Sequence, residues 1–341
     1  MAIMHNGRLG KFCRAATMIR LLFLSLLLGV TACTPLRVQQ PDLDLGRVHE
    51  GGAYRIAFSP SGRRLASGGA NGDVRVWSVA DGRRLADWPV DGDSITGLLW
   101  LDESRLLSAD AGGHLQLRNV DEGTLEASLG LGSVQAVAAA PDASWLVVAQ
   151  GERFRRLALP SLQILGETSG GSRILSLAVD HAGERIAVST RDGRVRLLDA
   201  DLEKALTLPR ASRDVWDLRF SPDDRTLVAA GWFRIVEWNL DRGTLEERPT
   251  EHLGKVASVD VSPDGRRLLS LGRITDSGVR LVDAESNRVL RRYKPHALCG
   301  RLIRFSPDGR HAASAAEDGS VYIYDLDRPY RPKVYYGEGE D

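Results

Sequence analysis

Histidine and acidic side chains are the first candidates for chemistry in this chain, because catalytic and metal sites need several such groups close together. Seven histidines are present, and none has the spacing of a metal-binding motif. His49, His252 and His296 recur at one position of the sequence repeat described below, so they belong to three separate structural units. The sequence also lacks a Gly-x-Ser-x-Gly motif, a phosphate-binding glycine loop and a His-Glu-x-x-His motif. We therefore expect no enzyme activity, no metal and no cofactor.

The overall composition is that of a folded protein without a general attraction for nucleic acid. The 341 residues are 43% hydrophobic and 26% charged, as in ordinary globular domains. The 45 basic and 45 acidic side chains give a net charge of zero, whereas nucleic-acid-binding domains usually carry a strong basic excess. Thirty-five glycines and frequent Asn-Gly, Asp-Gly and Ser-Pro pairs favour short strands joined by tight turns. These features predict an all-β fold and argue against a nucleic-acid partner.

The first 33 residues have the pattern of a secretory signal. Four basic residues precede an apolar run, Leu21–Val30, which is too short to span a bilayer. The run ends in Val30-Thr31-Ala32-Cys33, which resembles the lipid-attachment site of bacterial lipoproteins. The resemblance implies that residues 1–32 are a signal peptide and that Cys33 carries the lipid. The alternatives are an ordinary signal peptide, or a translation start at Met4 or Met18.

A turn motif recurs seven times along the rest of the chain. The clearest copies of a Ser-Pro-Asp-Gly turn begin at Ser59, Ser221, Ser262 and Ser306, and weaker copies begin at Leu101, Ala140 and Asp180. The mean interval of about 41 residues matches the period of a four-stranded propeller blade.

Each repeat contains the sequence signals of four strands. In the first repeat these are Tyr54–Phe58, Arg64–Ser67, Val74–Trp77 and a polar segment around Leu85. Alternating apolar residues and glycine-containing turns such as Asn71-Gly72 and Asp318-Gly319 fit antiparallel strands joined by tight turns. We therefore predict a seven-bladed β-propeller of four-stranded antiparallel blades over residues 43–336, preceded by a linker at 33–42 and followed by an acidic tail at 337–341.

Closing the ring requires an outermost strand for the seventh blade, because a closed ring leaves few exposed sheet edges. We predict that Leu43–Val48 supplies this strand. The competing candidate is Lys333–Tyr336.

The period, the turn and the recurring histidines make residues 47–336 resemble the WD-repeat β-propellers. In that family a His, a Ser, a turn Asp and a Trp form a buried hydrogen-bond chain within a blade. The resemblance implies this structural role for the following residues, with Asn71 at the turn of the first blade: His49, Ser67, Trp77, His296, Ser314 and Asp318. It also implies protein-binding positions on the face around one mouth of the central channel: Tyr54, Gln135, Arg173, Arg191, Asp214, Trp216, Lys255, Arg301 and Glu317.

The favoured function is a non-catalytic protein-protein interaction scaffold that is anchored to a membrane through lipid at Cys33. We expect a monomeric ring on the outer membrane facing the periplasm, because Thr34 stands where an Asp would resemble an inner-membrane retention signal. The inner membrane is the alternative location. Two other functions stay open, namely an enzyme or small-ligand binder with its site at the channel mouth, and an assembly factor for outer-membrane proteins.

Overall fold

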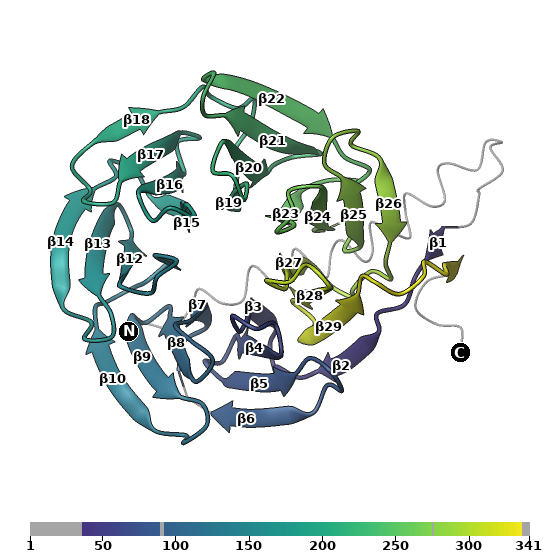
Figure 1. Cartoon of the computed structure of the whole chain (residues 1–341), viewed down its shortest axis with the longest axis horizontal. Helices are drawn as coiled ribbons and strands as arrows, with labels where there is room; N and C mark the ends of the chain where they lie inside the picture. Colours follow the sequence, from purple (N-terminus) through teal and green to yellow (C-terminus); the bar gives the residue numbers. More distant parts are fainter. Residues whose placement is uncertain (1–35, 89–91, 275, 336–341) are drawn as a thin grey trace, which may run out of the picture.

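The structure, a computed structural model, describes residues 36–88, 92–274 and 276–335. Its strands form seven four-stranded antiparallel sheets arranged in a ring around a central channel (Figure 1). The prediction of an all-β, seven-bladed propeller is therefore confirmed. Cys33 and the acidic tail at 337–341 lie outside the described residues.

The blades follow one another along the chain, and each is numbered here from its innermost to its outermost strand. The first two blades comprise β3 (Ala53–Phe58), β4 (Arg64–Gly69), β5 (Val74–Ser78) and β6 (Arg84–Trp88), then β7 (Ile95–Trp100), β8 (Arg105–Asp110), β9 (His114–Asn119) and β10 (Leu125–Gly130). The third and fourth comprise β11 (Ala136–Ala139), β12 (Trp145–Gln150), β13 (Arg153–Ala158) and β14 (Ile164–Ser169), then β15 (Ile174–Val179), β16 (Arg185–Thr190), β17 (Val195–Asp199) and β18 (Ala205–Thr207).

The remaining blades follow the same order, except that the last one takes its outermost strand from the start of the chain. The fifth and sixth comprise β19 (Leu218–Phe220), β20 (Thr226–Ala230), β21 (Arg234–Asn239) and β22 (Thr244–Pro249), then β23 (Val256–Val261), β24 (Arg267–Gly272), β25 (Val279–Asp283) and β26 (Val289–Arg292). The seventh comprises β27 (Gly300–Phe305), β28 (His311–Ala316), β29 (Ser320–Asp325) and β2 (Leu43–Arg47).

The ring is closed by β2, which pairs antiparallel with β29. Of the two candidates for this strand, Leu43–Val48 thus occupies the position. Lys333–Val334 instead forms β30, which pairs with β1 (Arg37–Val38) in a separate two-stranded ribbon at the outer edge of the ring (Figure 1). Beside the closing strand, the Asp42 carboxylate accepts hydrogen bonds from the backbone of Asp325 at 2.6 Å and from Arg328 at 2.9 Å.

The apolar core consists of seven clusters, one between each pair of neighbouring blades. Alternation along the strands produces this arrangement, since each sheet presents one face to the preceding blade and the other to the next. The cluster between the seventh and first blades contains Ile56, Trp77 and Ile323, and Leu43 and Leu45 of β2 pack against it. Ring closure is therefore an apolar contact as well as a strand pairing.

The turn between the second and third strands of the seventh blade requires glycine. Gly319 has a φ of +84°, a conformation that glycine adopts without strain. Its carbonyl accepts hydrogen bonds from the backbone of Val48 and His49 at 3.0 and 3.3 Å, and a Cβ at this position would overlap the His49 carbonyl. The turn thereby ties the end of the ring to its beginning.

Within the part of the chain that the structure describes, no helix has the length and apolar character needed to cross a membrane.

Candidate functional site

Buried hydrogen-bond chains fix the start of the first blade. His49 contacts the Ser67 hydroxyl through Nε2 at 2.7 Å and the Asp73 carboxylate through Nδ1 at 2.8 Å. The indole N–H of Trp77 donates to the same hydroxyl at 2.8 Å. The acceptor at the turn is therefore Asp73, and the assignment of Asn71 to this place is wrong, because the acid lies two residues further on, at the end of the turn.

The seventh blade contains a related chain in which a serine replaces the carboxylate. His296 contacts the Ser314 and Ser320 hydroxyls at 2.7 and 2.6 Å, and Ser314 also contacts the Tyr324 hydroxyl at 2.8 Å. Asp318 acts one step away, because it accepts from Ser320 at 2.5 Å. Burial lowers the pKa of His296 to about 4, so its imidazole is neutral at pH 7. These chains hold the backbone in place and leave no imidazole nitrogen for catalysis.

Aromatic and charged side chains gather at one end of the channel from four adjacent blades. We call this set the mouth cluster, and its members are half-buried: Tyr54, Trp216, Trp232, Lys255, Arg273, Arg301 and Glu317. The Lys255 ammonium lies 3.3 Å from the centroid of the Trp216 ring, and the Arg301 guanidinium lies 4.2 Å from the centroid of the Tyr54 ring. These are cation–π distances.

Beta-bulges place several of these positions toward the channel. The register of the innermost strand shifts by one residue at Tyr54, Thr96, Leu175, Ala257 and Arg301. A bulge leaves one residue unpaired and re-aims its side chain. The same repeat register thus delivers one side chain per blade to the mouth, and the residue type at that register decides what the mouth presents.

Glu317 links two of the cations. Its carboxylate lies 2.6 Å from Arg273 and 3.0 Å from Arg301. Lys255 makes no ion pair within the described residues. Burial, together with the charges of Arg273 and Arg301, lowers the pKa of Lys255 to about 7, and Asp214 opposes this shift.

Below the mouth lies a cavity of about 700 Å³ that the innermost strands enclose. Asp217 accepts from Arg304 at 3.0 Å, and Asp260 lies 3.3 Å from Arg219. Burial raises the pKa of Asp260 to about 6, although Arg219 and the backbone N–H of Phe305 favour its charged form. The charges deep in the channel are thus largely paired with one another.

The nine predicted binding positions divide into two groups. Tyr54, Trp216, Lys255, Arg301 and Glu317 belong to the mouth cluster, and Asp214 is close enough to Lys255 to affect its pKa. Gln135, Arg173 and Arg191 lie on the third and fourth blades, where Gln135 accepts from the backbone of Gly151 and the Arg191 N–H donates to the Arg173 carbonyl at 2.8 Å. These three residues do not join the aromatic and cationic cluster.

Sequence reasoning missed Arg273 and Trp232. Arg273 directly follows β24, as Arg191 follows β16 and Glu317 follows β28. The rule that located Arg191 and Glu317 was a position just before the turn Asp, but the turn of the sixth blade is longer and its acid is Asp276. Counting from the end of the strand would have found Arg273. Trp232, whose ring lies 5.8 Å from that of Trp216, gave no repeat signal.

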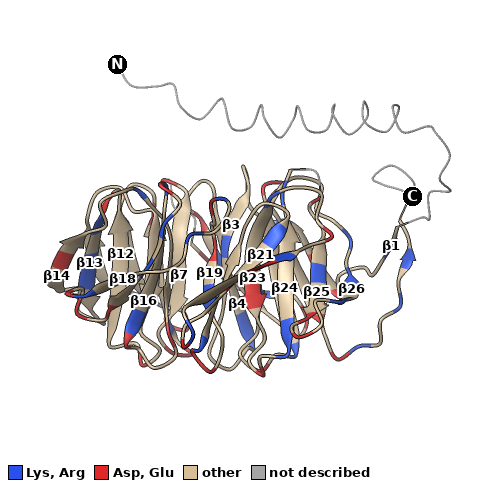
Figure 2. Cartoon of the chain, turned by 90° about the horizontal axis from the view of Figure 1, so that it is seen from above, with Lys and Arg blue, Asp and Glu red and all other residues tan. Residues whose placement is uncertain are grey.

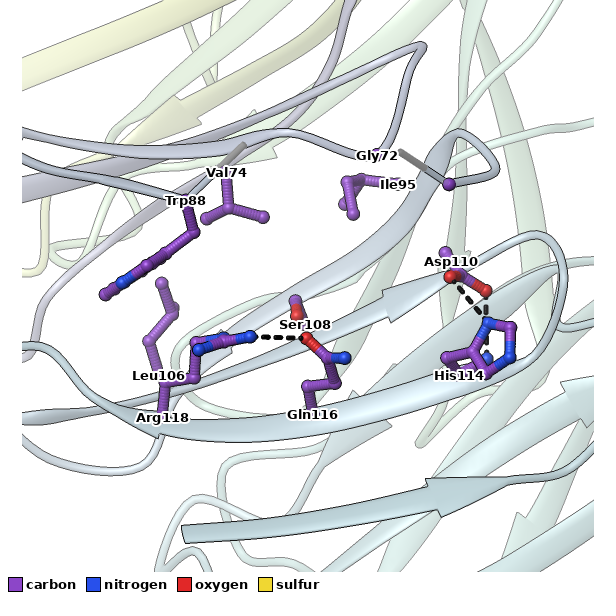
Figure 3. A pocket seen from close by; sticks show the side chains of 11 residues that line it. Gly72, Val74, Trp88, Ile95, Leu106, Ser108, Asp110, His114, Gln116 and Arg118 are labelled. Atoms are coloured by element: carbon purple, nitrogen blue, oxygen red, sulfur yellow. Dashed lines mark hydrogen bonds and ion pairs between the residues drawn. The ribbon is translucent and has the colours of Figure 1, made fainter. Parts of the chain in front are cut away.

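A second, smaller cavity of about 220 Å³ lies between the first and second blades (Figure 3). Its polar side chains pair with each other: Arg118 with Gln116 at 3.1 Å, and His114 with Asp110 at 3.0 Å. Arg118 also lies 5.8 Å from the Trp88 ring centroid. Neither here nor elsewhere among residues 36–88, 92–274 and 276–335 do three or more metal-ligating side chains come together.

A family model for the WD40 repeat, described as WD domain, G-beta repeat, matches residues 45–78, 203–239 and 288–325. Each match begins on the outermost strand of one blade and ends on the third strand of the next. The sequence unit is therefore offset by one strand from the blade, and this offset produces the closure by β2.

Similar curated proteins include three from distant organisms. The chain is 22% identical over 284 residues to apoptotic protease-activating factor 1 of Rattus norvegicus, which covers 82% of this chain and 22% of the relative. It is 24% identical over 322 residues to the ribosome biogenesis protein ERB1 of Meyerozyma guilliermondii, covering 81% and 39%. It is 34% identical over 113 residues to the small ribosomal subunit protein RACK1 of Caenorhabditis elegans, covering 32% and 34%. The chain thus spans less than half the length of these relatives.

Proposed function

Because the chain is a WD-repeat β-propeller, we propose that it is a non-catalytic scaffold that binds partner proteins through the mouth cluster. The observation that carries this proposal is the gathering of Trp216, Trp232, Tyr54 and Arg301 at one end of the channel, half-buried and in mutual contact. Tryptophan, tyrosine and arginine dominate the energetics of protein interfaces, since they offer a large contact area with polar groups attached. A rigid ring holds them in place before binding, so little order is lost on association.

Truncating the centre of this surface is expected to abolish partner capture. The variant is Trp216→Ala with Arg301→Ala, and the measurement is crosslinking followed by quantitative pull-down from the source cells. Hot-spot truncations cost about 2 kcal/mol or more each, so capture of specific partners should fall by at least about tenfold.

The matched control changes the same residue types on the outermost strand of the first blade, Trp88→Ala with Arg84→Ala. This control should capture partners as the unmodified chain does. If the mouth variant also captured them normally, the mouth would not be the binding surface.

We further propose that a lipid on Cys33 anchors this monomeric ring to the outer membrane, facing the periplasm. Leu36, the first described residue, lies three positions after Cys33. It directly precedes β1, which lies at the outer rim of the ring beside β26 and β30 (Figures 1 and 2). A tether at this point would hold the ring by its rim, and both ends of the channel would remain accessible to partners.

Metabolic labelling with palmitate tests the anchor. The full-length protein should incorporate label and fractionate with membranes, and Cys33→Ser should do neither, because the thiol is the atom that receives the lipid. A membrane fraction unchanged by Cys33→Ser would reject this attachment site while leaving the scaffold proposal intact.

A further inference from the structure

The charges of the mouth cluster do not balance. Four cations, Arg55, Lys255, Arg273 and Arg301, interact electrostatically with one another or with shared neighbours at this end of the channel. The acids in reach are Glu317, already shared by Arg273 and Arg301, and the exposed Asp214. The mouth therefore holds two more cations than anions before any ligand is bound.

Two of these cations lack a carboxylate partner within the described residues. Arg55, which lines the channel cavity, donates to the carbonyl oxygens of Thr96 at 2.7 Å and Tyr54 at 2.9 Å. Burial and the charge of Arg301 lower the pKa of Arg55 to about 10. Lys255 lies against the Trp216 ring. Nε of Arg301 is likewise buried without a hydrogen-bond partner in the described structure. Buried charges are costly unless they are paired.

Apolar surface adjoins the cations. Phe233 is 51% exposed and Leu253 is 70% exposed. The Phe233 ring lies 6.2 Å from that of Trp232, and its N–H donates to the carbonyl of Gly254, next to Lys255. A ligand that satisfies this surface carries negative charge beside apolar groups.

From this arrangement we infer that the mouth cluster binds an acidic segment of a partner protein, with its carboxylates at Arg55, Lys255 and Arg301 and an apolar side chain against Trp232 and Phe233. The inference rests on the proposed function and specifies its ligand. The cations come from four blades and flank aromatic rings, which suits a chain with several separated carboxylates better than one compact phosphate. An incoming carboxylate would also raise the pKa of Lys255 from about 7, so binding at pH 7 takes up protons.

The test uses a defined probe, the capped peptide Ac-Glu-Glu-Leu-Glu-Glu-NH2 with a fluorophore, and the full mature chain carrying Cys33→Ser. Fluorescence anisotropy should show binding at least about tenfold tighter than that of the peptide with glutamine in place of every glutamate. Lys255→Met and Arg55→Gln should each weaken binding of the acidic peptide at least about fivefold. Each should also reduce the dependence of affinity on salt. Lys255→Arg, which keeps the charge, should retain most of the affinity.

The matched control is Arg292→Gln, since Arg292 is paired with Glu251 on the outermost strand of the sixth blade, and it should bind as the unmodified chain does. Unfolding by heat is followed for each variant, so that Lys255→Met decides the question if Arg55→Gln fails to fold. Equal affinity for the acidic and glutamine peptides would overturn the inference. So would displacement of the peptide by inorganic phosphate at equal concentration, because the site would then take a free anion. Loss of partner capture in Trp216→Ala with Arg301→Ala, without acidic-peptide binding, would reject this ligand and leave the scaffold function standing.

Discussion

Deleting residues 36–47 is expected to abolish the single cooperative unfolding transition of the ring and to lower the free energy of unfolding by about 5 kcal/mol. The deletion removes β2, so β29 loses its outer neighbour and becomes an exposed edge. It also removes Leu43 and Leu45 from the apolar cluster between the seventh and first blades, at about 1–2 kcal/mol each. Since natural domains are stable by only about 5–15 kcal/mol, the loss is comparable with the whole stability.

The control for this deletion is a shorter one. Deleting residues 36–38 removes β1, which pairs only with β30 in the outer ribbon, so β2 and the ring closure stay intact. Circular dichroism during heating should show a midpoint within a few degrees of that of the full chain for the short deletion. The long deletion should show a broad, early transition with aggregation through the free edge of β29. Equal midpoints for the two deletions would mean that β2 does not close the ring.

The fold was predictable because a propeller repeats one local pattern. The four strand signals of the first repeat begin within a residue of β3, β4, β5 and β6, since alternation and turn glycines are properties of neighbouring residues. The choice between Leu43–Val48 and Lys333–Tyr336 for the closing strand was harder, because it depends on a pairing between the two ends of the chain. No local pattern encodes such a pairing.

The candidate site was predictable in register but not in composition. Counting along the repeat located Tyr54, Trp216 and Arg301 at the mouth, because the bulge recurs at the same place in several blades. Counting could not show that Glu317 would pair with Arg301 and Arg273 and leave Lys255 without an ion pair. That outcome depends on distances between side chains of different blades, which only the closed ring defines.

The dependence of stability on pH is the second large effect, and it is hidden by two buried groups with opposite signs. The pKa of His296 is about 4 in the folded chain and about 6.5 when unfolded. Between these values the unfolded chain binds a proton that the folded chain does not, so stability falls as the pH falls. From pH 7 to pH 5 this group removes about 2 kcal/mol.

Asp260 acts in the opposite direction. Its pKa is about 6 in the folded chain and about 3.8 when unfolded. Here the folded chain binds the proton first, so stability rises as the pH falls from 6 toward 4. From pH 7 to pH 5 Asp260 returns about 1 kcal/mol, and the unmodified protein should therefore change little over this range.

Single variants should separate the two contributions. With His296→Gln, the free energy of unfolding from urea titrations should rise by about 1 kcal/mol between pH 7 and pH 5. With Asp260→Asn it should fall by about 2 kcal/mol over the same range. Each variant also has a lower stability at pH 7 or a changed hydrogen-bond network, so the slope with pH, rather than the stability itself, is the diagnostic quantity. Other groups titrate in all three proteins and cancel in the comparison. Parallel slopes for the two variants would mean that neither buried group controls stability in this range, whereas opposite slopes would show that the channel carboxylate offsets the acid sensitivity that the neutral His296 gives to the ring.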